Sequence, residues 1–309
     1  MQRTFLGLDK IPVSERAHFS QGHVWIDKES KHKASRQTPE PESIGASSII
    51  SNVEDVARWL SAFVHRTAPL LDSSYSELSR PRMLISESNI PYLSPCFAGL
   101  GWEIQYYRGH ALLSHDGRWA GCMSTMLYMP SKEYGFVMMG NCETAGPVQE
   151  VGWHLIDSML GVPMEQRFDW RTHMVEQRTR FFKVASKEDL FPELQGGIES
   201  SANLDVADLV GSYWNEGYHD LDLRAGPGEG DWLEVDWTTR AYPRRIVVRE
   251  HAYDNLYVAH VIDQDTESVT AIRCGFEVDE RGTCHRVGFQ FYGEAGDMVW
   301  FDRVGGETV

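Results

Sequence analysis

The chain has 309 residues, of which 42% are hydrophobic and 24% charged, a composition typical of a globular protein long enough for two domains. Its formal net charge is −16, from 45 acidic and 29 basic residues. An acidic surface repels phosphate backbones and anionic lipid headgroups, so the charge argues against nucleic acid and membranes as partners. No run approaches 18 apolar residues and the N-terminus lacks the apolar core of a signal peptide, so we predict a cytoplasmic protein.

The cysteine and histidine spacings favour neither a disulfide framework nor a metal site. Five cysteines form no C-x-x-C pair, which is typical of a reducing compartment. Cys274 and Cys284 fall on neighbouring predicted strands, where a disulfide depends on geometry that the sequence does not give. The twelve histidines show no metal-ligand spacing such as H-x-x-x-H, so we predict no metal and no other cofactor.

The first 86 residues predict an irregular segment followed by two helices. Residues 1–45 contain scattered prolines and a charge run, Asp27–Lys33, which is typical of a solvated loop. Ser51 or Asn52 is a plausible N-cap of the first helix. Its apolar face would comprise Val53, Val56, Ala57, Leu60 and Phe63 or Val64. Residues 73–86 predict a shorter helix that ends near Arg80-Pro81.

Four strands and a helix are predicted next. The strands are Gly101–Tyr107, Ala111–His115, Cys122–Met129 and Tyr134–Gly140, the last two joined by a tight turn and therefore antiparallel. The final strand is apolar throughout, which indicates a sheet covered by helices on both faces. A helix over residues 147–160 would bury Val148, Val151, Leu155 and Met159. Residues 1–160 therefore predict an α+β domain with an antiparallel sheet of three to five strands.

The remainder predicts a linker and an all-β domain. Residues 161–203 form the linker, with a helix within Gln166–Lys183 that uses Trp170, Met174 and Phe181 or Phe182 as apolar contacts, and a loop at Gly196–Asn203. In residues 204–309, short strand-like runs alternate with turn residues, which indicates a barrel or sandwich. The runs are Leu221–Leu223, Trp232–Trp237, Arg245–Arg249, Leu256–Val261, Val269–Val278, Val287–Tyr292 and Met298–Val304.

Five ordered segments within residues 1–160 carry a family resemblance. They are Leu6–Asp9, Ser43–Trp59, Gly99–Trp102, Ser114–Gly117 with Gly121, and Asn141. Together they resemble the C-terminal portion of β-lactamase-related, penicillin-binding-protein-like serine hydrolases of the class C and peptidase S12 type, in the branch where His replaces the Lys of the third motif. Asp208–Tyr218 resembles the opening of the small lipocalin-like barrel appended to many members.

The resemblance implies a pocket for a small acyl substrate. A serine attacks the acyl carbon of an ester, amide or acyl-thioester, and the third motif forms one edge of the pocket. His115 would be the base or donor, and the N–H of Arg118, which follows Gly117, would be one oxyanion donor. Asp116 and Trp119 would contact the substrate. The alternative for His115 is an ordinary hydrogen-bonded surface histidine, and the flanking Gly117 and Gly121 favour the motif.

The nucleophile motifs of the family have no convincing counterpart. Ser30–Lys33 fits Ser-x-x-Lys but lies in the charge run, without the apolar helix that would bury the lysine. Tyr213–Asn215 and Tyr253–Asn255 fit Tyr-x-Asn but follow the third motif instead of preceding it. The chain therefore predicts either a truncated serine hydrolase or acyltransferase, or a pseudoenzyme that binds a small molecule or a partner chain. A weaker alternative is that His115 alone acts as acid or base.

The missing motifs also predict an interaction surface. In the resembled fold the outer strands of the sheet come from the segment that carries those motifs. Without it, the sheet edge and the packing face of the nucleophile helix are exposed. We therefore predict a homodimer or a partner chain that covers the exposed sheet edge.

Overall fold

The computed structural model describes residues 1–36, 44–119, 121–143, 145–181, 183–196, 204–228, 232–240, 242–280, 282–291 and 296–305. Contacts divide the chain into two compact units, Met1–Glu176 and Gln177–Val309. Phe168 and Trp170, from the segment predicted as a linker, pack in a core of the first unit. The loop predicted at Gly196–Asn203 lies, from residue 197 on, outside the described residues, as does Phe182.

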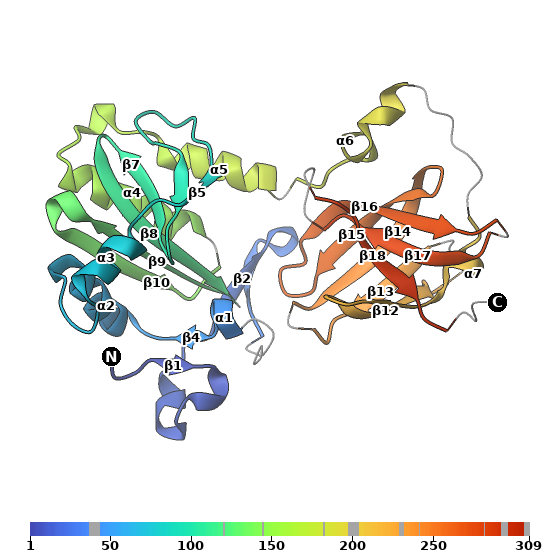
Figure 1. The fold of residues 1–309 in the computed structure, drawn as a ribbon, viewed down its shortest axis with the longest axis horizontal. Helices are drawn as coiled ribbons and strands as arrows, with labels where there is room; N and C mark the ends of the chain where they lie inside the picture. The colour runs from blue at the N-terminus through green and yellow to red at the C-terminus, as the bar shows by residue number, and fades with distance from the viewer. Residues whose placement is uncertain are drawn as a thin grey trace. The chain divides into compact units, whose positions relative to one another are not determined.

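The first unit is built on a six-stranded antiparallel sheet with the order β10-β9-β8-β7-β6-β5 (Figure 1). The strands are β5 Met83–Ser86, β6 Cys96–Ala98, β7 Glu103–Tyr107, β8 His110–Trp119, β9 Cys122–Met129 and β10 Tyr134–Gly140. The prediction of three to five strands was too low, and β5 falls within the span predicted as a helix. That helix, α3, covers only Asp72–Leu78, because Pro81 ends it and the next residues pair with β6.

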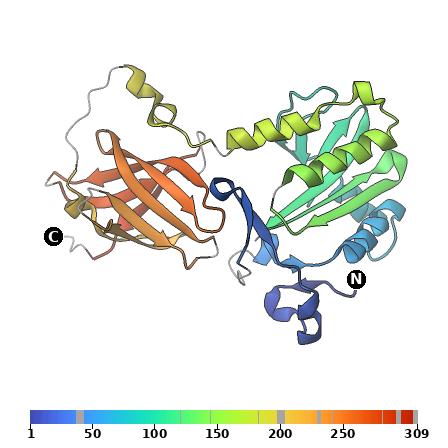
Figure 2. The ribbon, with the colours of Figure 1, turned by 180° about the vertical axis from the view of Figure 1, so that it is seen from behind.

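Helices cover both faces of this sheet, as the apolar run in β10 predicted. Helix α2, Val53–His65, packs on one face, and α4, Ala145–Met159, with α5, Trp170–Phe181, on the other (Figure 2). Side chains in β10 alternate accordingly: Val137 joins the cluster around Leu60 and Phe63, and Phe136 joins the cluster around Trp170. Two layers of apolar side chains therefore hold the sheet between the helices.

The predicted buried face of α4 was wrong at two of its four residues, since Val148 and Leu155 are half-buried but Val151 and Met159 are exposed. Val151 is 51% exposed and Met159 39%, whereas Ile156 and Asp157 are buried. Gly152 explains the rotation, because a Cβ there would lie 3.3 Å from the Phe136 ring, so the helix approaches the sheet through its smallest residue. The hydrophobic pattern counts neither Gly152 nor Asp157, whose carboxylate accepts a hydrogen bond from the buried Tyr107 hydroxyl at 2.9 Å.

The N-terminal segment is more regular than predicted. β1, Phe5–Leu6, pairs with β4, Ile49–Ile50, on either side of a hairpin of β2, His23–Ile26, and β3, Lys31–Ala34. The short helix α1 covers Ile44–Ser47. The charge run predicted as a loop forms the turn and second strand of this hairpin. It is solvated as expected, since every residue of β3 is exposed.

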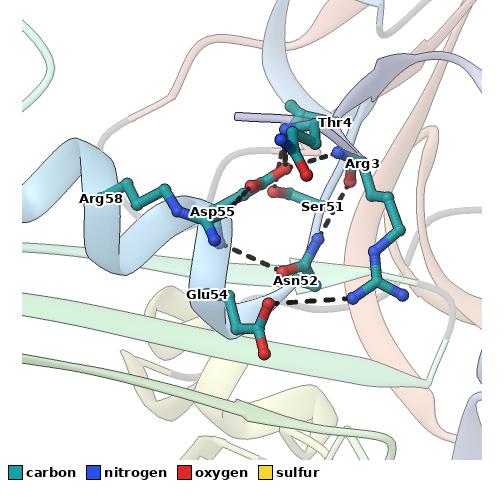
Figure 3. Close-up of polar contacts among 8 residues, drawn as sticks. Arg3, Thr4, Ser51, Asn52, Glu54, Asp55 and Arg58 are labelled. Atoms are coloured by element: carbon teal, nitrogen blue, oxygen red, sulfur yellow. Dashed lines mark hydrogen bonds and ion pairs between the residues drawn. The ribbon is translucent and has the colours of Figure 1, made fainter.

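Helix α2 begins at the predicted cap and is tied to the N-terminus by a buried carboxylate. The Asn52 side chain accepts from the Asp55 N–H at 3.1 Å. Asp55 is 1% exposed. Its carboxylate accepts hydrogen bonds from the N–H groups of Arg3 at 2.7 Å and Gln2 at 2.9 Å, from the Thr4 hydroxyl at 2.9 Å and from Arg58 at 2.6 Å (Figure 3). Desolvation raises the pKa of Asp55, but these hydrogen bonds outweigh it and hold the pKa well below its ordinary value.

We expect Asp55→Asn to lower the unfolding temperature at pH 7, because an amide offers one acceptor oxygen where the carboxylate offers two charged ones. The folded pKa is depressed, so the stabilisation is complete above the unfolded pKa of ~3.9 and is lost as the pH falls below it. Calorimetry at pH 7 and pH 3 checks this: the gap between wild type and variant should narrow at pH 3. Glu54→Gln is the matched control, since Glu54 is exposed and reaches Arg3 only at 3.9 Å. Equal losses in both variants would contradict the assignment.

The second unit is a closed barrel of eight antiparallel strands, β11 to β18 (Figure 1). The strands are β11 Gly211–Asn215, β12 His219–Ala225, β13 Leu233–Trp237, β14 Arg244–Tyr253, β15 Leu256–Asp263, β16 Val269–Val278, β17 Cys284–Phe289 and β18 Val299–Arg303. Two short helices, α6 Lys187–Leu190 and α7 Val206–Leu209, precede it. The predicted barrel is therefore confirmed, while its lipocalin-like character stays a prediction.

Side chains fill the interior of the barrel. Tyr213, Phe289 and Phe301 are fully buried in one cluster, and the Tyr213 hydroxyl donates to the Leu209 carbonyl at 2.7 Å. Cys274 and Cys284 belong to the same cluster as free thiols, opposite Phe289 and Val278 in the ladder rather than each other. Among the helices of the described residues, none is long and apolar enough to cross a membrane.

We expect Phe301→Ala to destabilise the barrel by about 3–5 kcal/mol, the usual cost of a buried phenyl ring and the cavity that it leaves. Trp214→Ala on the neighbouring strand is the control, because Trp214 is 43% exposed and its loss should cost less than ~1 kcal/mol. Chemical denaturation of both variants measures the difference. Similar costs for the two would mean that the interior is not packed as described.

Candidate functional site

The sequence predicted that the His115-Asp116-Gly117 motif lies at the end of a strand. In the structure the motif lies within β8. Strand β8 continues to Trp119 and pairs with β9 from Leu113 to Trp119. Its pairing with β7 ends at Ser114. Residues 115–119 therefore overhang: β9 lies on one side, and no strand of the described residues lies on the other. The outward backbone N–H and C=O groups of residues 115–118 pair with no strand of the described residues, so they are available to a ligand.

The pleat of β8 divides the predicted site residues between two faces. His115 and Gly117 share the face of Leu113, which packs on the α2 side. Coverage by α2 ends before His115, which is exposed. Asp116 and Arg118 point to the α4 side, where Gln149 donates to Asp116 at 3.1 Å and Arg118 pairs with Glu143 at 2.7 Å. The structure therefore brings His115 and Gly117 together and does not bring Asp116 to them.

Trp119 and Ser124 complete the face that carries His115. Trp119 is half-buried and lies two residues beyond Gly117 on that face, opposite Cys122. Ser124 lies directly opposite Gly117, and a Cβ on Gly117 would stand only 2.5 Å from the Ser124 hydroxyl. The sequence analysis did not single out Ser124, and only the register of two strands identifies it. The absence of a side chain on Gly117 therefore provides the space that the Ser124 hydroxyl occupies.

The carboxylate of Glu103 has a raised pKa and lies beside the site. The sequence analysis did not single it out. Glu103 pairs with Ser114 on the α4 side, next to Asp116. Desolvation and then the Asp116 carboxylate raise the pKa of Glu103, while His115 works in the opposite direction. Two carboxylates thus lie behind the strand whose front face carries His115.

Gly121 and Asn141, two further residues of the motif pattern, hold the β2–β3 hairpin against the overhang. The N–H of His23 lies 2.9 Å from the Gly121 carbonyl and 2.9 Å from the Asn141 carbonyl. The Glu143 N–H returns a bond to the His23 carbonyl at 3.0 Å. Gly121 has a φ of +74°, and a Cβ there would lie 2.4 Å from the His23 nitrogen, so only glycine fits. The sequence gives no local signal for His23, since the contact spans about a hundred residues.

The three weak motif matches do not assemble a nucleophile. Ser30 and Lys33 lie in the exposed β2–β3 hairpin instead of at the start of a buried helix. Tyr213 is buried in the barrel with its hydroxyl bonded to Leu209, and Tyr253 donates to Glu193 at 2.6 Å. In the described part of the chain, no group of three or more His, Cys, Asp or Glu residues is placed to hold a metal ion.

The first unit is thus an antiparallel sheet between two helical layers, in which β8 carries an exposed histidine and a segment that pairs with a strand on one side only. The family model described as Beta-lactamase matches residues 1–160. The chain belongs to the β-lactamase family.

Two curated relatives match most of the chain. An unguisins hydrolase, ungD, of Aspergillus violaceofuscus is 26% identical over 99% of this chain and 58% of its own length. A second, ungD′, of Aspergillus campestris is 27% identical over 72% of this chain and 42% of its own length. The chain thus spans about half the length of the curated relatives that it matches. Among solved structures, an octameric penicillin-binding protein homologue from Pyrococcus abyssi aligns with a TM-score of 0.43 and 14% identity, over 98% of this chain and 57% of that one.

We expect Gly117→Ala to destabilise the first unit by about 1–3 kcal/mol, because the added methyl overlaps the Ser124 hydroxyl. Removing that hydroxyl in the double variant Gly117→Ala, Ser124→Gly should recover most of the loss. Gly146→Ala in α4 is the control, since nothing lies within 4 Å of its Cβ position, and it should be neutral or stabilising. Urea denaturation measures all four proteins, and a double variant no more stable than Gly117→Ala would show that the clash is elsewhere.

Proposed function

We propose that residues 1–160 form the histidine-bearing wall of a hydrolase site that cleaves an ester or amide bond of a small acyl substrate. The observation that carries the proposal is the overhang of β8. It presents the exposed His115 side chain and the open backbone of residues 115–118 at the same edge. A histidine beside free backbone donors is the combination that an acyl-transfer transition state requires.

In this proposal each residue has a distinct role. His115 donates to or accepts from the substrate's leaving group or carboxylate. The N–H of Arg118 is one oxyanion donor, and Gly117 keeps side chains away from the approaching acyl group. Asp116 acts indirectly, since its bond to Gln149 fixes the strand against α4. Trp119, half-buried on the face of His115, offers an apolar surface to the substrate.

We propose the reaction class from the names of the relatives, and we propose where the attacking group lies from the length of the relatives. The matched relatives are named as hydrolases, which favours water over a second acceptor as the final acyl acceptor. The matched region makes up only 58% of one relative and 42% of the other. We place the attacking serine on sequence outside these 309 residues, because Ser30 and Lys33 lie on an exposed hairpin. The 309 residues would then supply substrate binding and acid–base groups.

A pseudoenzyme is the second candidate. The exposed position of Ser30 and Lys33 on the β2–β3 hairpin favours it, because these residues do not form a nucleophile site. If no nucleophile joins the site, the overhang of β8 can still bind a carboxylate or a peptide segment through its backbone groups. The barrel is a poorer ligand site, since aromatic side chains occupy its interior.

We expect His115→Ala to lower kcat/KM for a chromogenic ester about 100-fold in the protein translated from the complete in-frame transcript, the usual effect of losing a general acid–base group. His110→Ala is the matched control, because His110 lies on the same strand but bonds Ser131 at 2.7 Å, away from the overhang. Equal rates for wild type and His115→Ala would refute the proposed role.

Fluorophosphonate labelling separates the two candidates. The 309-residue chain alone should form no covalent adduct. A protein that includes in-frame sequence upstream of Met1 should be labelled once, on a serine of that added sequence. A stop codon directly upstream in the transcript would favour the pseudoenzyme, and an adduct on Ser30 would overturn the assignment of the nucleophile.

A further inference from the structure

On the face that carries His115, a hydroxyl occupies the place of a side chain on Gly117. Ser124 lies between Gly117 of β8 and Met139 of β10 in the register of the sheet. Its Oγ lies 2.5 Å from the position that a Cβ of Gly117 would take. Along β8, the groups on this face therefore run from the His115 imidazole through the Ser124 hydroxyl to the Trp119 ring.

The Ser124 hydroxyl is open to a ligand. None of the described residues forms a hydrogen bond with it. The side chain is only half-buried, and its oxygen is not among the enclosed polar atoms of the described chain. A serine hydroxyl donates one hydrogen bond and accepts up to two, so this group can bind an oxygen that a substrate brings to the face.

The charged neighbours of His115 on β8 are engaged elsewhere. Asp116 and Arg118 bind side chains on the α4 side, at 3.1 Å and 2.7 Å. On the opposite face, the His115 imidazole and the Ser124 hydroxyl form no hydrogen bond with any residue that the structure describes. A substrate bound over this face therefore meets two hydrogen-bonding groups that the fold does not use.

The spacing of the two groups determines what they can bind. The hydroxyl stands at the Gly117 position, two residues along the strand from His115, and two residues of a strand span roughly 7 Å. A hydrogen bond to each group spans ~2.8 Å. One oxygen is therefore too small to bridge the two, and a substrate that uses both groups needs two separate acceptor oxygens.

We propose that Ser124 is a specificity-determining residue of the hydrolase site, whose hydroxyl donates a hydrogen bond to a second oxygen of the substrate while His115 contacts the scissile group. The inference rests on the proposed function and names its substrate class: acyl compounds that carry a further carbonyl or carboxylate oxygen a few bonds from the scissile carbonyl. Gly117 is part of this arrangement, because any larger residue would displace the hydroxyl.

Steady-state kinetics of the protein translated from the complete in-frame transcript tests the proposal with three ethyl esters. Ethyl acetate has no acceptor beyond the ester, N-acetylglycine ethyl ester adds a carbonyl, and monoethyl succinate adds a carboxylate. The wild type should prefer one of the last two, and its choice identifies the acceptor. Ser124→Ala should raise the KM for that ester about tenfold with little change in kcat, because one hydrogen bond to the bound substrate is lost. The KM for ethyl acetate should not change.

Thr125→Val is the matched control. Thr125 is the next residue of β9, points to the α4 side opposite Asp116 and is 8% exposed, so the loss of its hydroxyl should leave the preference among the esters unchanged. Ser124→Ala should unfold at the wild-type temperature, since no hydrogen bond within the described chain is removed. A lower unfolding temperature together with an equal rise in KM for all three esters would assign Ser124 a structural role and overturn the proposal. So would a wild type that prefers neither of the larger esters.

Binding to the 309-residue chain separates this inference from the proposed function. If the longer wild-type protein hydrolyses none of the esters, the proposed function fails, and the binding role of Ser124 is still measured. Saturation-transfer NMR with N-acetylglycine ethyl ester and monoethyl succinate should show millimolar binding of one of them to the wild-type chain. Ser124→Ala should weaken that binding about tenfold, and Thr125→Val should not. Equal affinities for wild type and Ser124→Ala, or no binding by the wild type, would overturn the inference.

Discussion

The pleat of β8, held in register by β9, is the constraint on which the site depends. Because successive side chains of a strand point to opposite faces, His115 and Gly117 share one face while Asp116 and Arg118 share the other. A slip of one residue would exchange the two sets. The pairing from Leu113 to Trp119, with Leu113 packed among the side chains beneath α2, excludes that slip. The burial of Leu113 therefore fixes the register that leaves His115 exposed to solvent two residues later.

Sequence reasoning was most accurate where local chemistry decides the structure. Asn52 caps α2, and β9, β10 and β16 have the predicted bounds, because their signals lie within the element. Errors arose where distant residues decide. β5 has no burial pattern and exists only because β6 pairs with it. The face of α4 depends on Gly152 and Asp157, which no hydrophobic count includes. The β2–β3 hairpin is hidden in a charge run because β3 has no buried residue.

The candidate site divides in the same way. The family motif identified His115, Gly117 and Gly121 from the sequence, and the structure gives each glycine a physical reason: Ser124 crowds Gly117, and His23 crowds Gly121. The motif could not show that Asp116 faces α4, since a string of letters carries no strand direction. Nor could it show His23, Ser124 or Glu103, which reach the region only through strand pairing and hairpin docking.

Unequal strand lengths leave two kinds of open backbone in one sheet. β7 stops pairing at Ser114, so β8 overhangs it and offers backbone groups next to a charged, polar surface. β5 is the outermost strand, and it offers backbone groups next to apolar side chains. Polar surroundings suit a small charged ligand. An apolar edge strand is stabilised most by contact with another apolar segment, because such contact removes both its backbone groups and its side chains from water. The same deficit in hydrogen bonding therefore has different neighbours in the two places: charged and polar groups beside the overhang of β8, and apolar side chains along β5.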